Sequence, residues 1–525
     1  PPAEVAGIPV NYDEAKVGAY TLPDPLILLN GKRVRDARAW AKQRRPEIVR
    51  LFEENQFGRS PQRPSSFGFD VFDKGSPAFG GKALRKQVTL RLAGSIKADL
   101  LIYTPRGAKP APLLLNLSFT ANCNVADDPE VKCGEVWGPG KKKIPAVQGR
   151  RFGRIDVARL LDAGFGFATM YYGDVDPDFE GGLPLGVRAA FLRPGQTAPA
   201  ADEWGAIAAW AWGLSRAMDY LETDKDVDAR RVALHGVSRL GKTVMWAGAR
   251  DTRFALVIAS CSGEGGAALS RRNYGETVAH LTAPSRFTYQ FCANYGKYGE
   301  RVERLPVDAN LLVALIAPRP LLLQTGDKYF WSDPKREFLA AVAAGPVYRL
   351  LGRQGLETDQ MPAPGTGVYH TLGYFEHEVG HGALPSDWDE YLRFLTEELK
   401  PYVDRTYRTR PGRADTFIMG SSMGGIISLY AAARYPQVFG NVGAVSTHFP
   451  VGDGMVVDWL AQHLPDPATH RIWMDRGTAT LDATYPPFQA RADSVFRAGG
   501  YRDGPRFSTR VYEGAAHDER SWRVR

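Results

Sequence analysis

The stretch RVALHGVSRLGKTV, residues 231–244, decides the expected fold, because it reads as a buried strand that turns abruptly into a helix. Branched apolar residues over 231–235 are typical of a strand, Gly236 permits a tight turn, and helix formers resume over 242–250. Such a junction holds a serine at the carboxyl edge of a parallel sheet, above the first amide groups of the helix. Ser238 is therefore a candidate nucleophile.

The motif departs from the strict pattern Gly-x-Ser-x-Gly. Leu240 occupies the place of the second glycine, and Gly241 follows it. Serine is also a preferred residue at the N-cap of a helix, so the motif by itself leaves both catalysis and capping open for Ser238.

The chain on either side of this junction alternates between strand-like and helix-like segments. Strand patterns occupy 67–103, 111–119, 165–174, 254–260 and two runs within 311–326, LLVALIA and PLLLQTG; helical patterns occupy 37–57, 157–163, 201–222 and 334–344. This rhythm predicts an α/β-hydrolase three-layer sandwich with a mostly parallel sheet. Ligands are then expected at the carboxyl ends of the strands.

Size and composition limit the possible functions. The 525 residues exceed the length of roughly 250–300 residues at which single cores stop growing, so a large domain and a smaller one are expected. The formal charge of +8 is dispersed among nearly as many acids, which argues against nucleic-acid binding. No apolar run approaches the length of a membrane helix. The first residues lack signal-peptide features, which fits either a mature secreted protein or a cytosolic one.

The four cysteines are too few for a disulfide scaffold. Cys123 with Cys133, and Cys261 with Cys292, are possible pairs in an oxidising compartment. Four buried thiols are the alternative.

Three strand ends carry candidate residues in the order serine, acid, histidine that is typical of α/β-hydrolases. Asp327 and Asp333 follow the strand PLLLQTG, and His377 and His381 lie in the later loop GYFEHEVGHGALPSDW. We favour His381 over His377 as the general base because His381 lies between two glycines, where little bulk hinders its approach to Ser238.

The residues from His377 to His381 also spell H-E-x-x-H, which in a helix would place two zinc ligands on one face. A glycine interrupts the run, and Gly382 and Pro385 follow it, so a helix is not expected. The sequence therefore predicts no metal.

Four motifs together suggest a family: GVSRLGK, SGEGGAALSRRNYGET, APRPLLLQTGDKYFWSDP and HEVGHGALPSDW. Over residues 1–400 the chain resembles the bacterial glucuronoyl esterases of carbohydrate esterase family 15. The resemblance implies an α/β-hydrolase that cleaves, without a cofactor, the ester between 4-O-methyl-glucuronate on xylan and lignin alcohols. Its expected partner is glucuronoxylan or a lignin-carbohydrate ester, with no nucleic acid and no membrane. The protein is expected to be a monomer, secreted or periplasmic after removal of a signal peptide.

The resemblance also assigns roles to particular residues. It implies Ser238 as nucleophile, His381 as base and Arg239 as a stabiliser of the oxyanion. It further implies three contacts to the uronate sugar: Lys242, Glu276 and Trp331. A guanidinium directly after the nucleophile can reach the tetrahedral oxygen, and an indole offers a stacking face. An ordinary salt bridge between Lys242 and Glu276, and core packing of Trp331, are the structural alternatives.

The catalytic acid is where this chain departs from the family pattern. The family has a glutamate just before the S-G-x-G-G segment or an aspartate two residues before the tryptophan, where this chain has Cys261 and Tyr329. The substitutes are Asp327, Asp333 and Glu264. Asp333 is also a suitable N-cap, since a proline follows it. If no carboxylate reaches the histidine, the protein should bind carbohydrate but hydrolyse slowly.

Residues 401–525 contain a second elbow, Gly420-Ser421-Ser422-Met423-Gly424, followed by Asp475 or Asp482 and then His517. Ser422 is a second candidate nucleophile, unless these residues are an N-cap and surface polar groups. The stretch resembles the C-terminal half of a feruloyl or enterochelin (esterase D-type) esterase, which places Ser422, Asp482 and His517 at triad positions.

Only half of that second domain is present. It should expose a strand edge and either pack on the first domain or depend on a partner, with a low catalytic contribution. An acetyl or feruloyl esterase that uses Ser422, and a carbohydrate-binding protein with an impaired triad, are the alternatives to a glucuronoyl esterase.

Overall fold

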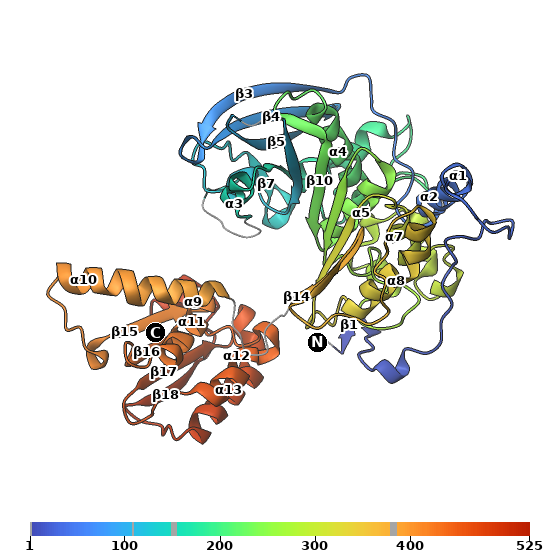
Figure 1. Cartoon of the computed structure of the whole chain (residues 1–525). Helices are drawn as coiled ribbons and strands as arrows, with labels where there is room; N and C mark the ends of the chain where they lie inside the picture. The colour runs from blue at the N-terminus through green and yellow to red at the C-terminus, as the bar shows by residue number, and fades with distance from the viewer. Residues whose placement is uncertain (1–2, 108–109, 149–154, 378–385, 525) are drawn as a thin grey trace. The chain divides into compact units, whose positions relative to one another are not determined.

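The computed structural model describes residues 3–107, 110–148, 155–377 and 386–524, which fall into two compact units, Pro1–Glu378 and Val379–Arg525 (Figure 1). The sequence analysis placed the division at residue 400. In the structure, Leu392 is fully buried in the core of the second unit, and Trp388 and Leu395 pack against that core. Residues 386–399 therefore belong to the second unit, because their apolar side chains are buried there.

The first unit is built on a ten-stranded sheet with the strand order β13-β14-β12-β11-β10-β6-β9-β5-β4-β3. The strands are β3 (Gly68–Ala78), β4 (Ala83–Ala93), β5 (Ile96–Pro105), β6 (Ala111–Ser118), β9 (Gly166–Tyr171), β10 (Val227–Val237), β11 (Leu256–Ser260), β12 (Leu321–Gly326), β13 (Gly367–Tyr369) and β14 (Leu372–His377). The central strands from β9 to β14 pair in parallel, and antiparallel strands extend both edges. This confirms the predicted mixed, mostly parallel sheet.

Two small hairpins and eight α-helices complete the description of this unit. The hairpins pair β1 (Glu4–Val5) with β2 (Ile8–Pro9) and β7 (Glu135–Trp137) with β8 (Lys143–Pro145). The helices are α1 (Ala37–Ala39), α2 (Arg45–Asn55), α3 (Val157–Asp162), α4 (Ala206–Leu221), α5 (Arg239–Arg250), α6 (Val278–Thr282), α7 (Ala309–Ala314) and α8 (Pro334–Leu350).

The run LLVALIA was predicted as a strand, and this prediction is wrong. Most of it forms helix α7, which begins after Asp308, whose carboxylate accepts a capping hydrogen bond from the amide of Ala309. Every residue of α7 is buried, so its sequence lacks the polar face that would have revealed a helical period.

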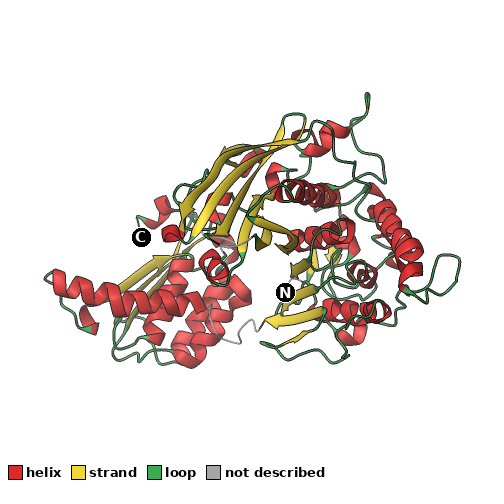
Figure 2. Ribbon diagram, turned by 45° about the horizontal axis from the view of Figure 1, so that its top comes forward, coloured by secondary structure: helices red, strands yellow, loops and turns green. Residues whose placement is uncertain are grey.

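The core lies between the sheet and a helical layer that contains α4, α5, α7 and α8 (Figure 2). Helix α4 is buried on nearly all sides, which explains its run of alanine and tryptophan. A smaller core forms where α3 and the segment after β6 pack near β5 and β9. No helix in the described ranges is long and apolar enough to cross a membrane.

One of the two possible disulfides is present. Cys123 and Cys133 are joined in the segment after β6. Cys261 and Cys292 are free thiols, so their suggested pairing is wrong. Cys292 is buried and Cys261 is partly buried, and burial raises the pKa of Cys261 to about 12.

The second unit contains a four-stranded parallel sheet in the order β15-β16-β17-β18. Its strands are β15 (Phe417–Ser421), β16 (Asn441–Val445), β17 (Arg471–Gly477) and β18 (Phe507–Tyr512); its helices are α9 (Ser386–Arg393), α10 (Lys400–Thr406), α11 (Met423–Arg434), α12 (Met455–His463), α13 (Pro486–Ala498) and α14 (Glu519–Trp522). Its core is separate from that of the first unit.

Strand β15 is an edge strand: within the described residues its only partner in the sheet is β16. Phe417 and Met419, two residues apart on one face of β15, are 70% and 72% exposed. Parallel sheets are normally covered on both faces. The exposed edge expected from the missing half of this fold is therefore present.

We predict that Met419→Lys reduces self-association of the purified protein, because a charged side chain on an edge strand opposes pairing with a second chain. Light scattering against protein concentration measures the effect. Tyr407→Lys is the matched control, since Tyr407 is 63% exposed but lies outside the sheet. An equal reduction by both variants would show that added charge, and not the strand edge, is responsible.

Candidate active site

The elbow around Ser238 is formed by close contacts between α5 and the sheet. Ser238 has φ 58° and ψ −126°, at the junction of β10 and α5. A Cβ atom on Gly236 would lie 2.4 Å from the carbonyl oxygen of Leu240, and one on Gly241 would lie 2.9 Å from that of Ser260. Both glycines are thus required for the helix to begin here.

Ser238 is not a capping residue in this structure. Its side chain makes no capping hydrogen bond to α5, and its amide donates to the carbonyl oxygen of Ser260 at 2.8 Å. The unfavourable backbone conformation of Ser238 therefore brings no capping interaction in return, which is typical of a functional position.

Arg239, the next residue, is held by a carboxylate that the sequence analysis did not identify. Its Nη1 lies 2.5 Å from Oδ2 of Asp178. Asp178 accepts three further hydrogen bonds: from the hydroxyl of Tyr172 at 2.9 Å, the hydroxyl of Tyr289 at 2.9 Å and Nε2 of Gln290 at 2.7 Å. These contacts fix the guanidinium beside the elbow. No motif marks Asp178, because Arg239, Tyr289 and Gln290 reach it from distant segments.

The three residues expected to contact the sugar lie close together. Their contacts differ from the structural alternatives, which were a salt bridge between Lys242 and Glu276 and core packing of Trp331. Oε1 of Glu276 accepts a hydrogen bond from Nη2 of Arg286 at 2.9 Å, so Glu276 forms its ion pair with Arg286 and not with Lys242. Lys242 is 5% exposed, its ammonium makes no hydrogen bond among the described residues, and burial lowers its pKa. Trp331 is only partly buried, and the Arg286 guanidinium lies 5.3 Å from its ring centre.

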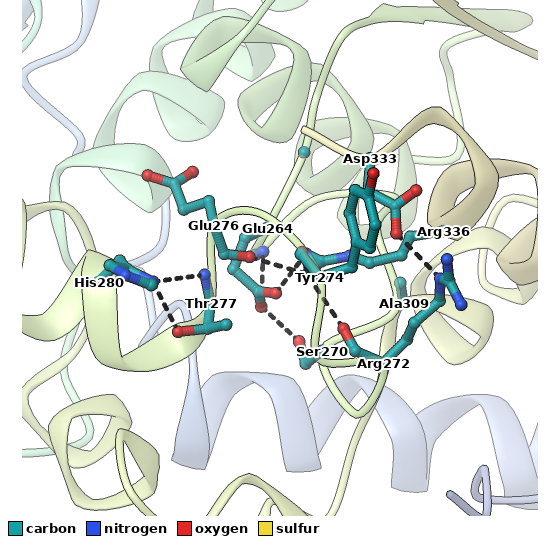
Figure 3. Close-up of polar contacts among 12 residues, drawn as sticks. Glu264, Ser270, Arg272, Tyr274, Glu276, Thr277, His280, Ala309, Asp333 and Arg336 are labelled. Atoms are coloured by element: carbon teal, nitrogen blue, oxygen red, sulfur yellow. Dashed lines mark hydrogen bonds and ion pairs between the residues drawn. The ribbon is translucent and has the colours of Figure 1, made fainter. Parts of the chain in front are cut away.

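Two of the three candidate acids are engaged in buried ion pairs (Figure 3). Asp333 is 3% exposed and accepts from Nε of Arg272 at 2.9 Å, and it makes no capping hydrogen bond to α8. Glu264 is fully buried and accepts from Nη2 of Arg336 at 2.6 Å and from the hydroxyl of Ser270 at 2.5 Å. Both carboxylates therefore have structural partners already.

Asp327 lies where the sheet brings two strand ends together. It directly follows Gly326, the last residue of β12, and its amide donates to the carbonyl oxygen of His377 at 3.1 Å. Strand β12 pairs with β14 so that Gly326 is opposite His377. The Asp327 carboxylate also lies 3.4 Å from Nζ of Lys328.

His381 lies outside the described residues. His377 ends β14, so the start of the H-E-x-x-H run is a strand and not a helix. Among the described residues, no group of three potential metal ligands comes together. Glu376, on the same strand, is 5% exposed, and burial together with the neighbouring charge of Asp327 raises its pKa to about 7.

A buried glutamate, Glu337, lies close to the segment that begins with Cys261, the residue at the position of the family's acid. Oε1 of Glu337 accepts a hydrogen bond from the amide of Gly263 at 2.7 Å. Its charge also raises the pKa of Cys261, after the larger effect of burial. Burial raises the pKa of Glu337 to about 7. The sequence analysis missed Glu337 because its position in α8 resembles an ordinary first-turn acid.

The second unit contains a very similar elbow. Ser422 has φ 57° and ψ −118°, and makes no capping hydrogen bond to α11. A Cβ on Gly420 would lie 2.4 Å from the backbone of Gly424, and one on Gly425 would lie 2.5 Å from Oγ1 of Thr447. A Cβ on Gly424 would meet nothing within 4 Å.

Both elbows therefore need a glycine at the same position relative to the serine. In each, the crowded position is the third residue after the serine: Gly241 in the first unit and Gly425 in the second. Leu240 and Gly424, the second residues after the serines, occupy the position that defines the strict motif. The departure at Leu240 thus does not weaken the first elbow.

The acid and histidine of the second set are in contact. Nδ1 of His517 lies 2.5 Å from Oδ1 of Asp482. The other carboxylate oxygen of Asp482 accepts from the hydroxyl of Ser446 at 2.6 Å and from the amide of Gly477 at 2.5 Å. Asp475 instead binds the amide of Ser446. Of the two acids left open by the sequence, Asp482 is the one that faces the histidine.

Comparison with known proteins places the first unit in a family. The model of the family "Glucuronyl esterase, fungi" matches residues 199–352. "Carbohydrate esterase MZ0003", from an unknown prokaryotic organism, is 44% identical over 402 residues, which cover 74% of this chain and 92% of that protein. The chain belongs to the glucuronoyl esterases of carbohydrate esterase family 15. It is accordingly a carboxylic-ester hydrolase, as the resemblance predicted.

Solved structures of this family share the fold. A glucuronoyl esterase from Solibacter usitatus is 47% identical, with a TM-score of 0.67, covering 73% of this chain and 98% of that one. A promiscuous family member from a marine bacterial metagenome is 43% identical, with a TM-score of 0.66 and the same coverages. The model of a family described as "Putative esterase" matches residues 359–523, in agreement with the predicted second esterase segment.

We predict that Asp178→Asn lowers kcat for ester hydrolysis by roughly ten-fold or more, because a weakly held guanidinium is no longer positioned at the developing oxyanion. Steady-state kinetics on benzyl glucuronate measure the loss. Asp162→Asn is the matched control, since Asp162 is exposed and pairs only with Lys82 among the described residues. An unchanged kcat in Asp178→Asn would show that Arg239 needs no such support.

Proposed function

We propose that the first unit cleaves esters of 4-O-methyl-glucuronate on xylan with lignin alcohols, and that Ser238 is its nucleophile. The observation that carries the proposal is the Ser238 elbow, with an arginine beside it that is bound by Asp178, whose carboxylate accepts three further hydrogen bonds. Relatives named 4-O-methyl-glucuronoyl methylesterase support the substrate class: the Wolfiporia cocos protein is 34% identical over 67% of this chain.

The reaction proceeds through an acyl-enzyme. Ser238 Oγ attacks the ester carbonyl carbon while His381 accepts the serine proton. The carbonyl oxygen becomes an oxyanion, which the Arg239 guanidinium stabilises together with backbone amides. When the carbonyl re-forms, the bond to the alcohol oxygen breaks and the alcohol leaves with the proton from His381. Water then repeats the sequence on the acyl-enzyme and releases the glucuronate.

The sugar is held by Lys242, Glu276 and Trp331 in this proposal. A buried ammonium with no hydrogen bond among the described residues can donate to the sugar oxygens. Trp331 supplies a partly exposed ring, and Arg286 keeps the Glu276 carboxylate in place. The net charge of +8 favours encounter with uronate-bearing xylan.

Asp327 is the acid that we assign to His381. It follows the strand next to the one that leads to His381, and its amide already binds the end of that strand. Asp333 and Glu264 would each have to leave a buried arginine to take this role, which would leave an uncompensated buried charge.

We also propose that the protein acts outside the cytoplasm. The disulfide between Cys123 and Cys133 supports an oxidising compartment, whether periplasmic or extracellular.

A second candidate activity is ester hydrolysis by Ser422. The contact between His517 and Asp482 favours it, since that pair could orient a general base. We propose that this activity is low, because the described residues of the unit form a sheet of four strands with the Ser422 strand at its edge, without the further strands on which such an oxyanion site is usually built.

We predict that Ser238→Ala lowers benzyl glucuronate hydrolysis by at least about a thousand-fold, whereas Ser422→Ala leaves it unchanged. Release of benzyl alcohol measures both variants. If Ser422→Ala removes the activity instead, the assignment to the first unit is wrong. Binding of glucuronoxylan without turnover dependent on either serine would favour the carbohydrate-binding alternative.

We predict that Asp327→Asn lowers kcat by roughly two to four orders of magnitude, because the histidine loses its orienting charge. Asp333→Asn should instead keep most of kcat and lower the melting temperature, because Arg272 loses a buried partner. Kinetics and thermal denaturation of both variants make the comparison. The reverse pattern would identify Asp333 as the catalytic acid.

A further inference from the structure

A polar cavity of about 300 Å³ lies at the carboxyl ends of β6 and β9 in the first unit. Its lining includes Asn122, shortly after β6, and Asp174, shortly after β9. Strand β6 has β9 on one side and β10, which leads to Ser238, on the other. The cavity therefore lies at the edge of the sheet where parallel α/β folds bind ligands, but none of the residues assigned to the Ser238 site lines it.

Covalent and hydrogen bonds hold the walls of this cavity. The disulfide between Cys123 and Cys133 joins the segment after β6 to the segment before β7, and Cys133 lines the cavity. The amide of Trp137 donates to the hydroxyl of Tyr171 at 3.2 Å, and its indole Nε1 donates to the carbonyl oxygen of Gly173 at 2.8 Å. The hairpin of β7 and β8 is thereby attached to the end of β9 (Figure 1). The cavity is therefore preformed.

Asn122 brings a buried oxygen without a partner to the lining. Asn122 is 7% exposed, and its Nδ2 donates to the carbonyl oxygen of Asp99 at 2.8 Å. Its Oδ1 accepts no hydrogen bond from any of the described residues. A buried acceptor that is left unpaired costs free energy, so a ligand that donates a hydrogen bond to Asn122 is favoured.

A second acceptor in the lining faces an ammonium that is too far away for a hydrogen bond. Oδ1 of Asp174 lies 3.6 Å from Nζ of Lys143, which also lies 5.6 Å from the ring centre of Trp137. Burial raises the pKa of Asp174 to about 6, because the charged carboxylate has lost water. A hydroxyl group can donate to the carboxylate and accept from the ammonium at the same time.

These groups distinguish between the classes of ligand that could enter. The lining carries three lysines and three acids: Lys97, Lys132, Lys143, Asp99, Glu135 and Asp174. The charges therefore balance, and an inorganic anion could not donate to the two acceptors. Potential metal ligands do not come together in groups of three within the described part of the chain. Sugar hydroxyls both donate and accept, and the volume is at the lower end of the range of about 300–1,000 Å³ for small-molecule sites.

We propose that this cavity binds one neutral sugar ring of a polysaccharide. Asn122 Oδ1 and the Asp174 carboxylate accept hydrogen bonds from its hydroxyls, and the Lys143 ammonium donates to one of them. The side chains of Glu135 and Lys143 are exposed, so the ring can enter from solvent as part of a longer chain.

The sugar is assigned to the xylan main chain, a step that rests on the function proposed for Ser238. The turn after β9 connects the two regions. Tyr171 lines the cavity, while the next residue, Tyr172, donates to Asp178, which holds Arg239. A main chain bound in the cavity would thus run beside the residues that position the arginine.

The experiment measures binding of xylotetraose by calorimetry to the full chain with Ser238→Ala, so that its result does not depend on hydrolysis. We expect Asn122→Ala and Asp174→Ala each to weaken binding by roughly five- to ten-fold, because each removes a hydrogen-bond acceptor. Asn124→Ala is the matched control. Asn124 is 8% exposed, and its Oδ1 also accepts nothing from the described residues, but it does not line the cavity.

Thermal denaturation of each variant shows whether the fold is retained. The proposal is overturned if Asn122→Ala binds as its parent does, if Asn124→Ala loses as much affinity, or if the parent binds neither xylotetraose nor cellotetraose. Sulfate that binds more tightly than either sugar, and depends on Asn122, would overturn it as well. Tighter binding of xylotetraose than of cellotetraose supports the assignment to xylan, and the reverse contradicts it. Absence of benzyl glucuronate hydrolysis by wild type would contradict the function proposed for Ser238 and leave the sugar-binding result in place.

Discussion

The close approach of one helix to one strand end is the constraint on which both units depend. In each elbow a serine is placed at positive φ, and a glycine three residues later allows the helix to touch the neighbouring strand end. At Gly241 that neighbour is the backbone of Ser260, and at Gly425 it is Thr447. Any side chain there would push the helix away from the sheet, and the serine would leave the carboxyl edge.

Around the first elbow, most buried charged side chains form ion pairs. These ion pairs decide which charged groups remain free to contact a substrate. Arg336 pairs with Glu264 and Arg272 with Asp333, far from water, where an unpaired charge would be costly. Arg239 is matched by Asp178 but stays partly exposed. The Lys242 ammonium alone among these cations has no hydrogen bond within the described residues, which is why we propose it as a donor to a substrate oxygen.

In the second unit, the strand that leads to the elbow serine is also an edge strand. Its elbow forms and its acid contacts its histidine, because all three belong to strands β15 to β18 and the loops that follow them. The side of β15 that a complete sheet would cover carries exposed apolar residues instead. The environment of this elbow is therefore asymmetric, with one side of β15 left uncovered.

The sequence by itself determined what is local: both elbows, the strand and helix alternation, and the order of candidate residues. A turn, a glycine and a few helix formers are enough for these features, since they act within a few residues. It could not recognise α7, whose residues are all buried and so show no periodicity. It also could not identify Asp178, because Arg239, Tyr289 and Gln290 bind it from positions far away in the sequence. Only the tertiary structure decided which carboxylate has an arginine and which acid faces His517, because burial and pairing are properties of segments brought together by folding.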